Sequence, residues 1–330
     1  MHSKNTRLLA LENWLHAIGY EGDLRPIAGD ASGRRFYRLT WRSEHIGYSL
    51  IAVDAPPPES VEQIQQARSY FIDGEHLVFP TIHALNIQQG FALMDDMGDQ
   101  LLHDQLATNE APLYKQALAG LIEMQTAQAP LPATYTELLL DREMNLFSEW
   151  LVSAYLKAQI EDKGLWTALK AQLVQAIQAQ PQTRVHRDYH SRNLLLSKQR
   201  LGVVDFQDAV TGSYVYDVVS LLRDAYHETT ALDDYLMYFY ERSALAQAHS
   251  YAVFEEHFHT VCLQRQLKVA GIFVRLYLRD GKAAYLPHIP RVLNYLLYSA
   301  RYFSHLKGLV QWIEALHQQV IEKQAMEGHA

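Results

Sequence analysis

The chain has 330 residues, of which 48% are hydrophobic and 20% charged, and its formal net charge at pH 7 is −8. This composition is typical of a globular protein, and the length supports two lobes or domains. The acidic balance, without any run of Lys and Arg, argues against nucleic acid as a partner. The apolar runs are too short to span a membrane, and no obligate protein partner is indicated.

The single cysteine, Cys262, rules out an intrachain disulfide. No charged segment followed by a long apolar stretch opens the sequence, so no signal peptide is predicted. We therefore expect a cytoplasmic protein in which Cys262 is a buried and unreactive thiol. The sixteen histidines show no zinc-ligand spacing, and structural or solvated roles are expected for them.

The first hundred residues predict a small lobe of mixed helix and strand. Leucines at helical spacing indicate a helix over 6–18 that ends at Gly19. The segments "LRPIAGDASGRRFYRLTW" and "YSLIAVDAPPP" then indicate three short strands, with a glycine-bearing turn between the first two. An amphipathic helix, "ESVEQIQQARSYFI", precedes two more strands, "TIHALN" and "GFALMDDM". Five strands around a helix form an α+β lobe, which we place at 1–96.

The remainder, 97–330, has the pattern of a helical lobe. One exception is 185–207, where "NLLLS" and "LGVVDF" predict a hairpin that turns at Lys198–Arg200. A loop and hairpin within a helical lobe is a common place for catalytic side chains. Apolar residues at i, i+3 and i+4 predict helices over 111–127, 136–160, 166–180, 214–226, 230–247, 251–279 and 289–324.

The stretch "VHRDYHSRNLLLSKQRLGVVDFQDA", residues 185–209, carries the chemistry. Asp188 is followed five residues later by Asn193, and Asp205 comes at the end of a predicted strand. This order matches the parts of a kinase-type phosphoryl transferase. Asp188 would accept the proton of the acceptor hydroxyl, while Asn193 and Asp205 supply the oxygen ligands that Mg²⁺ requires. The stretch therefore predicts ATP as co-substrate and Mg²⁺ as cofactor.

The catalytic block resembles the aminoglycoside phosphotransferase family, which has the two-lobed protein-kinase-like fold. The span "HRDYHSRNLL…GVVDFQDAVTGSYVYDVVSLLRD", with "DAPP", "MDDMG" and "LDREMNLFSEWLV" upstream, is most similar to anomeric kinases of cell-wall recycling. Those enzymes phosphorylate N-acetylmuramate and N-acetylglucosamine. The resemblance covers nearly the whole chain, and it implies that His186 and Asp217 support the catalytic loop.

The spacing after Asp205 indicates a small acceptor. Only "FQDAVTGSYVY" separates Asp205 from Asp217, and no Ala-Pro-Glu motif follows. Protein kinases place a long activation segment here, which forms their peptide-binding surface. This chain leaves no room for one.

The nucleotide-binding side departs from the usual kinase pattern at Asp54. The strand "IAVD" stands where kinases have Val-Ala-Ile-Lys, so an aspartate takes the position of the phosphate-binding lysine. Either that register is wrong or other cations bind the phosphates. Arginine suits bidentate phosphate contact, and three arginines follow the predicted turn: Arg34, Arg35 and Arg38.

The turn and the link between the lobes complete the predicted nucleotide site. Backbone N–H groups around Gly29, Ser32 and Gly33 could line the phosphates, although a plain hairpin turn would show the same glycines. In "LMDDMG", backbone groups of Asp95 and Met97 are expected to meet adenine, the alternative being an ordinary strand end.

The acceptor site is expected in the helical lobe, opposite Asp188. Sugars suit a mixture of carboxylate, amide and aromatic groups. An amphipathic helix with a solvated acidic face would look similar. The segment "LLLDREMNLFSEWLV" offers Glu143 and Asn145 beside Asp141, Glu149 and Trp150, and the motif itself places His190 and Asp208 near the chemistry.

These observations predict a kinase that transfers the γ-phosphate of ATP to the anomeric hydroxyl of N-acetylmuramate or N-acetylglucosamine. One alternative keeps the machinery but changes the acceptor to an aminoglycoside, a choline-like amine or a homoserine-like alcohol. The resemblance in "LDREMNLFSEW" favours the sugar. A second alternative is a pseudokinase that binds a ligand without turnover. The missing strand lysine favours it, and the intact Asp188, Asn193 and Asp205 oppose it.

Overall fold

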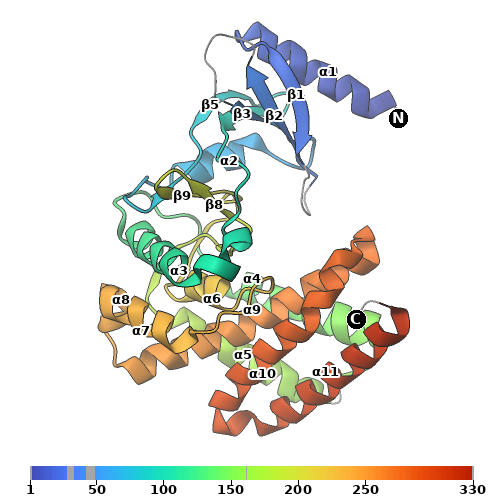
Figure 1. The fold of residues 1–330 in the computed structure, drawn as a ribbon. Helices are drawn as coiled ribbons and strands as arrows, with labels where there is room; N and C mark the ends of the chain where they lie inside the picture. Colours follow the sequence, from blue (N-terminus) through green and yellow to red (C-terminus); the bar gives the residue numbers. More distant parts are fainter. Residues whose placement is uncertain (1, 28–32, 42–48, 161, 329–330) are drawn as a thin grey trace.

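The computed structural model describes residues 2–27, 33–41, 49–160 and 162–328, and these form two lobes (Figure 1). A sheet with two helices forms one end of the molecule, and helices form most of the other. The predicted α+β, two-lobed fold is confirmed. The boundary at residues 96 and 97 stays a prediction. Among the described helices, none combines the length and the apolar character needed to cross a membrane.

The small lobe is built on a five-stranded sheet in which every neighbouring pair is antiparallel, as the alternating sequence predicts. Its strand order is β1-β2-β3-β6-β5. Arg35 pairs in register with Asp54, at the end of the sheet that faces the predicted turn. The strands are β1 (Gly22–Ile27), β2 (Arg35–Trp41), β3 (Ser49–Asp54), β5 (Ile82–Asn86) and β6 (Phe91–Asp95).

Each face of this sheet is covered by a helix (Figure 1). Helix α1 (His2–Ala17) buries Leu11 and Leu15 against a small core with Leu39, Ala52 and Leu93 of the strands. Helix α2 (Val61–Arg68) packs on the opposite face and joins a larger core that continues into the helical lobe. Because side chains alternate along a strand, each residue of β2 and β3 is assigned to one of these two faces.

A short three-stranded sheet, with order β4-β9-β8, lies where the lobes meet. Strands β8 (Leu194–Ser197) and β9 (Arg200–Val203) form the predicted hairpin, and the turn is Lys198–Gln199. Strand β4 (Leu77–Val78) runs parallel to β9 and was not predicted, because two residues carry no periodic signal.

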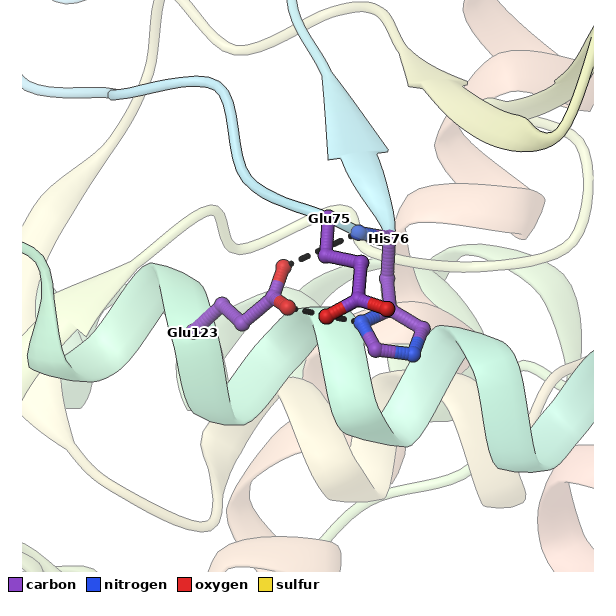
Figure 2. Close-up of side chains that lie close together, drawn as sticks. All are labelled: Glu75, His76 and Glu123. Atoms are coloured by element: carbon purple, nitrogen blue, oxygen red, sulfur yellow. Dashed lines mark hydrogen bonds and ion pairs between the residues drawn. The ribbon is translucent and has the colours of Figure 1, made fainter.

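The segment before β4 is fastened to α3 (Leu102–Thr126) by Glu123 (Figure 2). One oxygen of Glu123 accepts the backbone N–H of His76 at 3.1 Å, and the other lies 2.6 Å from His76 Nδ1. Glu75 lies beside them. A side chain at Gly74 would collide with Glu123, so glycine permits this close approach. The cluster of Glu75, His76 and Glu123 is therefore explained by the attachment of this segment to α3.

The helical lobe packs around α9 (Tyr251–Asp280), which is buried along most of its length. Strand β7 (Gln182–Val185) pairs with β10 (Val210–Ser213) and leads into the catalytic loop. The other helices are α4 (Glu137–Leu146), continued by a π-helical segment (Phe147–Tyr155), α5 (Lys163–Gln178), α6 (Tyr216–Leu222), α7 (Leu232–Arg242), α8 (Ala244–Gln247), α10 (Ile289–Tyr302) and α11 (Lys307–Glu327).

Two helices predicted as continuous are each split in the structure. The segment 230–247 breaks at Ser243, whose hydroxyl caps α8 by accepting the N–H of Ala246. The segment 289–324 breaks after Tyr302, where a short 3₁₀ turn (Ser304–Leu306) separates α10 from α11. Apolar spacing continues through both breaks, so the sequence pattern did not reveal them.

Candidate active site

The predicted catalytic residues lie on one tight loop between β7 and β8. Asp188 accepts at its backbone oxygen from the N–H of His190, at 3.0 Å, and from the side-chain amide of Asn193, at 2.9 Å. Since the Asn193 nitrogen is used in this way, its Oδ1 is the atom left to act as an acceptor. The loop therefore fixes the orientation of both side chains.

Two buried aspartates, in and just after α6, hold the backbone of this loop. Asp217, in α6, accepts the backbone N–H groups of His186 at 2.6 Å and Arg187 at 3.0 Å. Asp224, just after α6, accepts the N–H of Ser191 at 3.0 Å and also its hydroxyl. Burial raises the pKa of Asp217 to about 7, although the two N–H donors work against this. The loop is thus attached at both ends to one helix.

His186 is buried beneath the loop as a neutral ring. Its Nδ1 accepts the backbone N–H of Asp188 at 3.3 Å, so Nε2 carries the proton and donates to Val204 O at 3.0 Å. Burial lowers the pKa of His186 to about 4, which keeps it uncharged at neutral pH. The ring thereby links the catalytic loop to the strand that carries Asp205.

Asp205 follows β9 and lies beside the loop. The N–H of Val204 donates to the backbone oxygen of Asn193 at 3.1 Å, which brings the two predicted metal ligands together. Asp205 has φ +64° and Arg187 has φ +76°, a conformation that costs energy for residues other than glycine. The next residue, Phe206, is buried edge-on against Phe79, and this packing holds Asp205 in place.

The charge at Asp205 fits a divalent cation. Burial, followed by the nearby negative charge of Asp188, raises the pKa of Asp205 to about 6. The nitrogen of Gln207 donates to Asp205 Oδ1 at 2.7 Å. A carboxylate and an amide oxygen are hard ligands of the kind that Mg²⁺ prefers. Asn193 and Asp205 therefore form a donor set that suits this ion.

A buried charge network surrounds Asp188, and the sequence reading missed one of its members. Lys268 of α9 lies 3.3 Å from Glu143 Oε1 and donates to the hydroxyl of Tyr216 at 3.3 Å. Glu143 also forms an ion pair with Arg187. Burial alone would raise the pKa of Asp188, but the charges of Lys268 and Arg187 hold that pKa lower, at about 2. Asp188 is therefore ionised at neutral pH.

The predicted acceptor residues do not form a single cluster. Glu143 is part of the buried network described above. The amide of Asn145 is engaged with Asp141 and with Lys170 of α5, at 3.1 and 2.7 Å. Asp208 lies close enough to Asp205 to influence its pKa, and its backbone oxygen accepts from Arg187 at 3.3 Å. The structure thus places Asp208 near the chemistry and ties Asn145 to α5.

The structure explains the aspartate at the strand position where kinases carry a lysine. Asp54 points toward α1, like Ala52 two residues before it, and away from the face that carries Val53. There Arg7 of α1 binds the buried Asp54 carboxylate, and Arg35 of β2 donates to it at 3.3 Å. Asp54 and Arg35 therefore stabilise the sheet–helix contact, and the kinase-lysine alignment at Asp54 was wrong in register.

Arg34 lies directly before β2, on the side of the small lobe that carries Glu59. Its guanidinium is buried and lies 2.9 Å from Glu59 Oε2, at the start of α2, and its charge acts on Asp205. The other oxygen of Glu59 accepts the N–H of Gly33 at 3.1 Å. Of the three arginines predicted to contact phosphate, the structure brings Arg34 toward the acidic residues. The predicted Gly29 and Ser32 lie outside the described residues.

The link between the lobes is fixed by side chains. The Asp95 carboxylate accepts the N–H of Thr81 at 2.9 Å, and Arg38 binds Asp96 and Asp99. Met97 lies against Gly202 of β9, where a Cβ would meet its sulfur at 2.9 Å. Arg38, expected among the phosphate cations, is therefore paired at this link.

Three residues missed by the sequence reading belong to this site: Asp224, Lys268 and Glu59. Two of them, Lys268 and Asp224, are charged residues within apolar sequence patterns. Lys268 interrupts the apolar face of "LQRQLKVAGIF", and Asp224 ends the apolar run "DVVSLLRD". A charged residue within a buried pattern is rare unless it has a partner. That signal was present, but the partners themselves could not be read from spacing.

Comparison with known proteins agrees with this geometry. Residues 23–251 match the model of the phosphotransferase enzyme family. The chain is 37% identical over 320 residues to an N-acetylmuramate/N-acetylglucosamine kinase of Neisseria meningitidis, covering 92% of this chain and 94% of the relative. It is 36% identical to a kinase of the same name from Pseudomonas putida, over 83% of both chains.

Solved structures show the same architecture at low identity. The choline kinase LicA of Streptococcus pneumoniae superimposes with a TM-score of 0.59 at 12% identity, covering 90% of this chain and 99% of that one. An ethanolamine kinase of Plasmodium vivax gives 0.62 at 9% identity, covering 89% and 86%. The fold is that of the kinase-like phosphotransferases. The chain belongs to the phosphotransferase enzyme family.

Proposed function

We propose that this protein is an ATP-dependent kinase that phosphorylates the anomeric (C1) hydroxyl of N-acetylmuramate and N-acetylglucosamine during cell-wall recycling. The observation that carries the proposal is the 36–37% identity to kinases named for these two sugars, over most of the chain. The complete set of Asp188, Asn193 and Asp205 beside one loop supports it. Because ATP is the phosphate donor, we place the reaction in the cytoplasm.

Asp188 is proposed as the general base. Held ionised by Lys268 and Arg187, it accepts the proton of the C1 hydroxyl as that oxygen attacks the γ-phosphorus. The new bond joins the sugar oxygen to phosphorus, the bond to the bridging oxygen breaks, and ADP leaves. The C1 hydroxyl is the most acidic on the ring, because the ring oxygen withdraws electron density.

Asn193 and Asp205 are proposed to hold Mg²⁺. The ion supplies neutralisation of the charge on the β- and γ-phosphates. The contribution of the chain is to fix both ligands: Asn193 through its bond to the Asp188 backbone, and Asp205 through its own backbone neighbours.

Arg34 is proposed to take the role of the phosphate-binding lysine. It lies on the strand face directed toward Asp205, and Glu59 orients it as a carboxylate orients the lysine of a protein kinase. Backbone groups at Asp95 and Met97, in the link between lobes proposed at residues 96 and 97, are assigned to adenine. His190 and Asp208 are assigned to the acceptor side of Asp188.

The experiment that tests the proposal follows the reducing end of the sugar. Incubation with ATP and Mg²⁺ should remove reducing-sugar signal from either sugar in step with ADP release. A 1-deoxy analogue keeps the other contacts but lacks the nucleophile, so it should bind without accepting phosphate.

Three results would contradict the proposal in different ways. Phosphorylation of the 1-deoxy sugar, or accumulation of a 6-phosphate with an intact reducing end, would show that C1 is not the site. ATP consumption with amines or aminoglycosides alone would remove the sugar assignment and leave the kinase. Release of no ADP with any acceptor would favour a pseudokinase.

A further inference from the structure

Arg192 is an exposed cation on the catalytic loop. It lies four residues after Asp188 and directly before Asn193. Its guanidinium carbon stands 3.7 Å above the centre of the Tyr226 ring, which is close stacking for such a pair. In the part of the chain that the structure describes, no ion pair includes Arg192. Its position is fixed while its charge is left uncompensated.

The other cations around Asp188 are already occupied. Arg187 and Lys268 share the buried Glu143, and Arg265 donates to the hydroxyl of Ser220 at 2.7 Å. These groups hold the loop and the charge of Asp188. Lys268 and Arg265 are buried and Arg187 is half-buried, whereas Arg192 is exposed.

Nearby aromatic rings form an apolar surface beside this arginine. Tyr226 meets the edge of His190 at 5.4 Å and packs near Phe273 of α9 at 5.9 Å. His288 lies 5.0 Å from Tyr226, and Tyr285 lies 5.1 Å from Phe273. Aromatic faces of this kind pack against the apolar faces of sugar rings and against acetyl methyl groups.

Two arginines carry charge in this neighbourhood: Arg192, and Arg291, which donates to the backbone oxygen of Ala225 at 2.9 Å and lies 4.0 Å from Glu228. Burial, and then the charge of Arg192, lowers the pKa values of His103 and His288, in the second case to about 4. Both imidazoles are therefore neutral. The nearest carboxylate, Asp224, is engaged by Ser191 and by the N–H of Tyr226 at 2.9 Å.

We propose that Arg192 binds the lactyl carboxylate of N-acetylmuramate and sets the preference of the enzyme between its two sugars. This inference rests on the proposed function. The two acceptors differ only at O3, where N-acetylmuramate carries a lactyl ether with a carboxylate and N-acetylglucosamine carries a hydroxyl. In the proposed arrangement C1 lies at Asp188, and the substituent on O3, two ring carbons away, is directed toward Arg192, four residues further along the loop. A guanidinium offers a carboxylate two parallel N–H groups.

The test compares three acceptors in three proteins. The acceptors are N-acetylmuramate, its neutral methyl ester and N-acetylglucosamine. The proteins are the wild type, Arg192→Gln and Arg192→Lys. A charge-assisted contact predicts that Arg192→Gln lowers the ratio of kcat/KM for N-acetylmuramate to that for N-acetylglucosamine by roughly 10- to 100-fold. Arg192→Lys should restore part of the ratio, and the ester should respond like the neutral sugar.

Arg200→Gln is the matched control. Arg200 is another exposed arginine, on the hairpin, with one weak contact to the Gly74 backbone oxygen at 3.5 Å. Its substitution should leave the ratio unchanged. Circular dichroism and the melting temperature confirm that each variant is folded.

The outcomes separate this inference from the proposed function. An equal loss of kcat/KM for all three acceptors in Arg192→Gln would show that Arg192 supports the loop and does not bind the carboxylate. A wild type that treats the acid and its ester alike would also overturn the inference. In both cases the sugar kinase stands. A wild type that phosphorylates neither sugar removes the proposed function and the inference together.

Discussion

The catalytic loop and the first residues of β2 face the same site, but they are held in place by different kinds of contact. Asp217 and Asp224 bind the loop by accepting its backbone N–H groups from buried positions. Arg34 is held through a side-chain ion pair with Glu59. A backbone fixed by buried carboxylates is part of the folded core, whereas Arg34 and Glu59 are joined through their side chains. Substitutions in the two regions should therefore differ in how strongly they affect stability and how strongly they affect activity.

The largest effect is expected at the metal ligand on the loop side. Asp205→Ala should abolish Mg²⁺-dependent turnover, because it removes one of the two proposed metal ligands. Steady-state ADP release measures this, and chelation of divalent cations should stop the wild type equally. Unchanged activity in either experiment would remove Asp205 from the proposed metal site.

The next largest effect concerns the base. Asp188→Asn should lower kcat by roughly 10²- to 10⁴-fold, the usual range for loss of a general base. The amide keeps the volume of the carboxylate but cannot accept the proton. The melting temperature should change little, since the carboxylate of Asp188 is not a brace of the loop. Turnover near that of the wild type would refute the assignment.

Removal of Asp217, which holds the backbone of the catalytic loop, should lower the stability of the fold. Asp217→Ala leaves the buried N–H groups of His186 and Arg187 without their acceptor, and each such donor costs about 1–3 kcal/mol. We expect the free energy of unfolding to fall by about 3 kcal/mol, measured by urea denaturation. A variant as stable as the wild type would show that the loop is not fixed in this way.

The smallest of the four effects is expected at Arg34, beside the sheet of the small lobe. Arg34→Gln should raise KM for ATP by roughly 10- to 100-fold, as expected for loss of a charge-assisted phosphate contact. Glu59→Gln should act in the same direction but more weakly. Both variants should lose less stability in urea than Asp217→Ala, because neither removes the acceptor of a buried backbone N–H group. Arg35→Gln is the control, because Arg35 lies on the other face of β2 and pairs with Asp54.

Much of the fold could be predicted because its signals are local. Alternation over five or six residues marks a strand, and the five strands of the sheet appeared where the pattern indicated. The spacing from Asp188 to Asn193 spans a single loop, and Asp205 ends the adjoining hairpin. Chemistry carried by one continuous stretch of chain is visible in the sequence before any tertiary contact is known.

The parts that could not be predicted depend on distant partners. Asp54 lies on the face of β3 where it pairs with Arg7, 47 residues away in the sequence. Lys268 acts on Asp188 from a helix far along the chain, and Glu143 joins them from a third element. A single sequence gives the type of each residue. It does not show which partner compensates the cost of burying a charged side chain.

The arginine at the start of β2 has a practical consequence for chemical labelling. Acyl-phosphate analogues of ATP label many kinases because the strand lysine attacks the acyl group and retains it as a stable amide. A guanidinium remains protonated at neutral pH and is a poor nucleophile. With Arg34 in that place, as proposed, this protein should escape such reagents in a cell extract. Probes that seek its ATP site would need a guanidine-selective group, which would in turn spare the lysine-bearing kinases of a host.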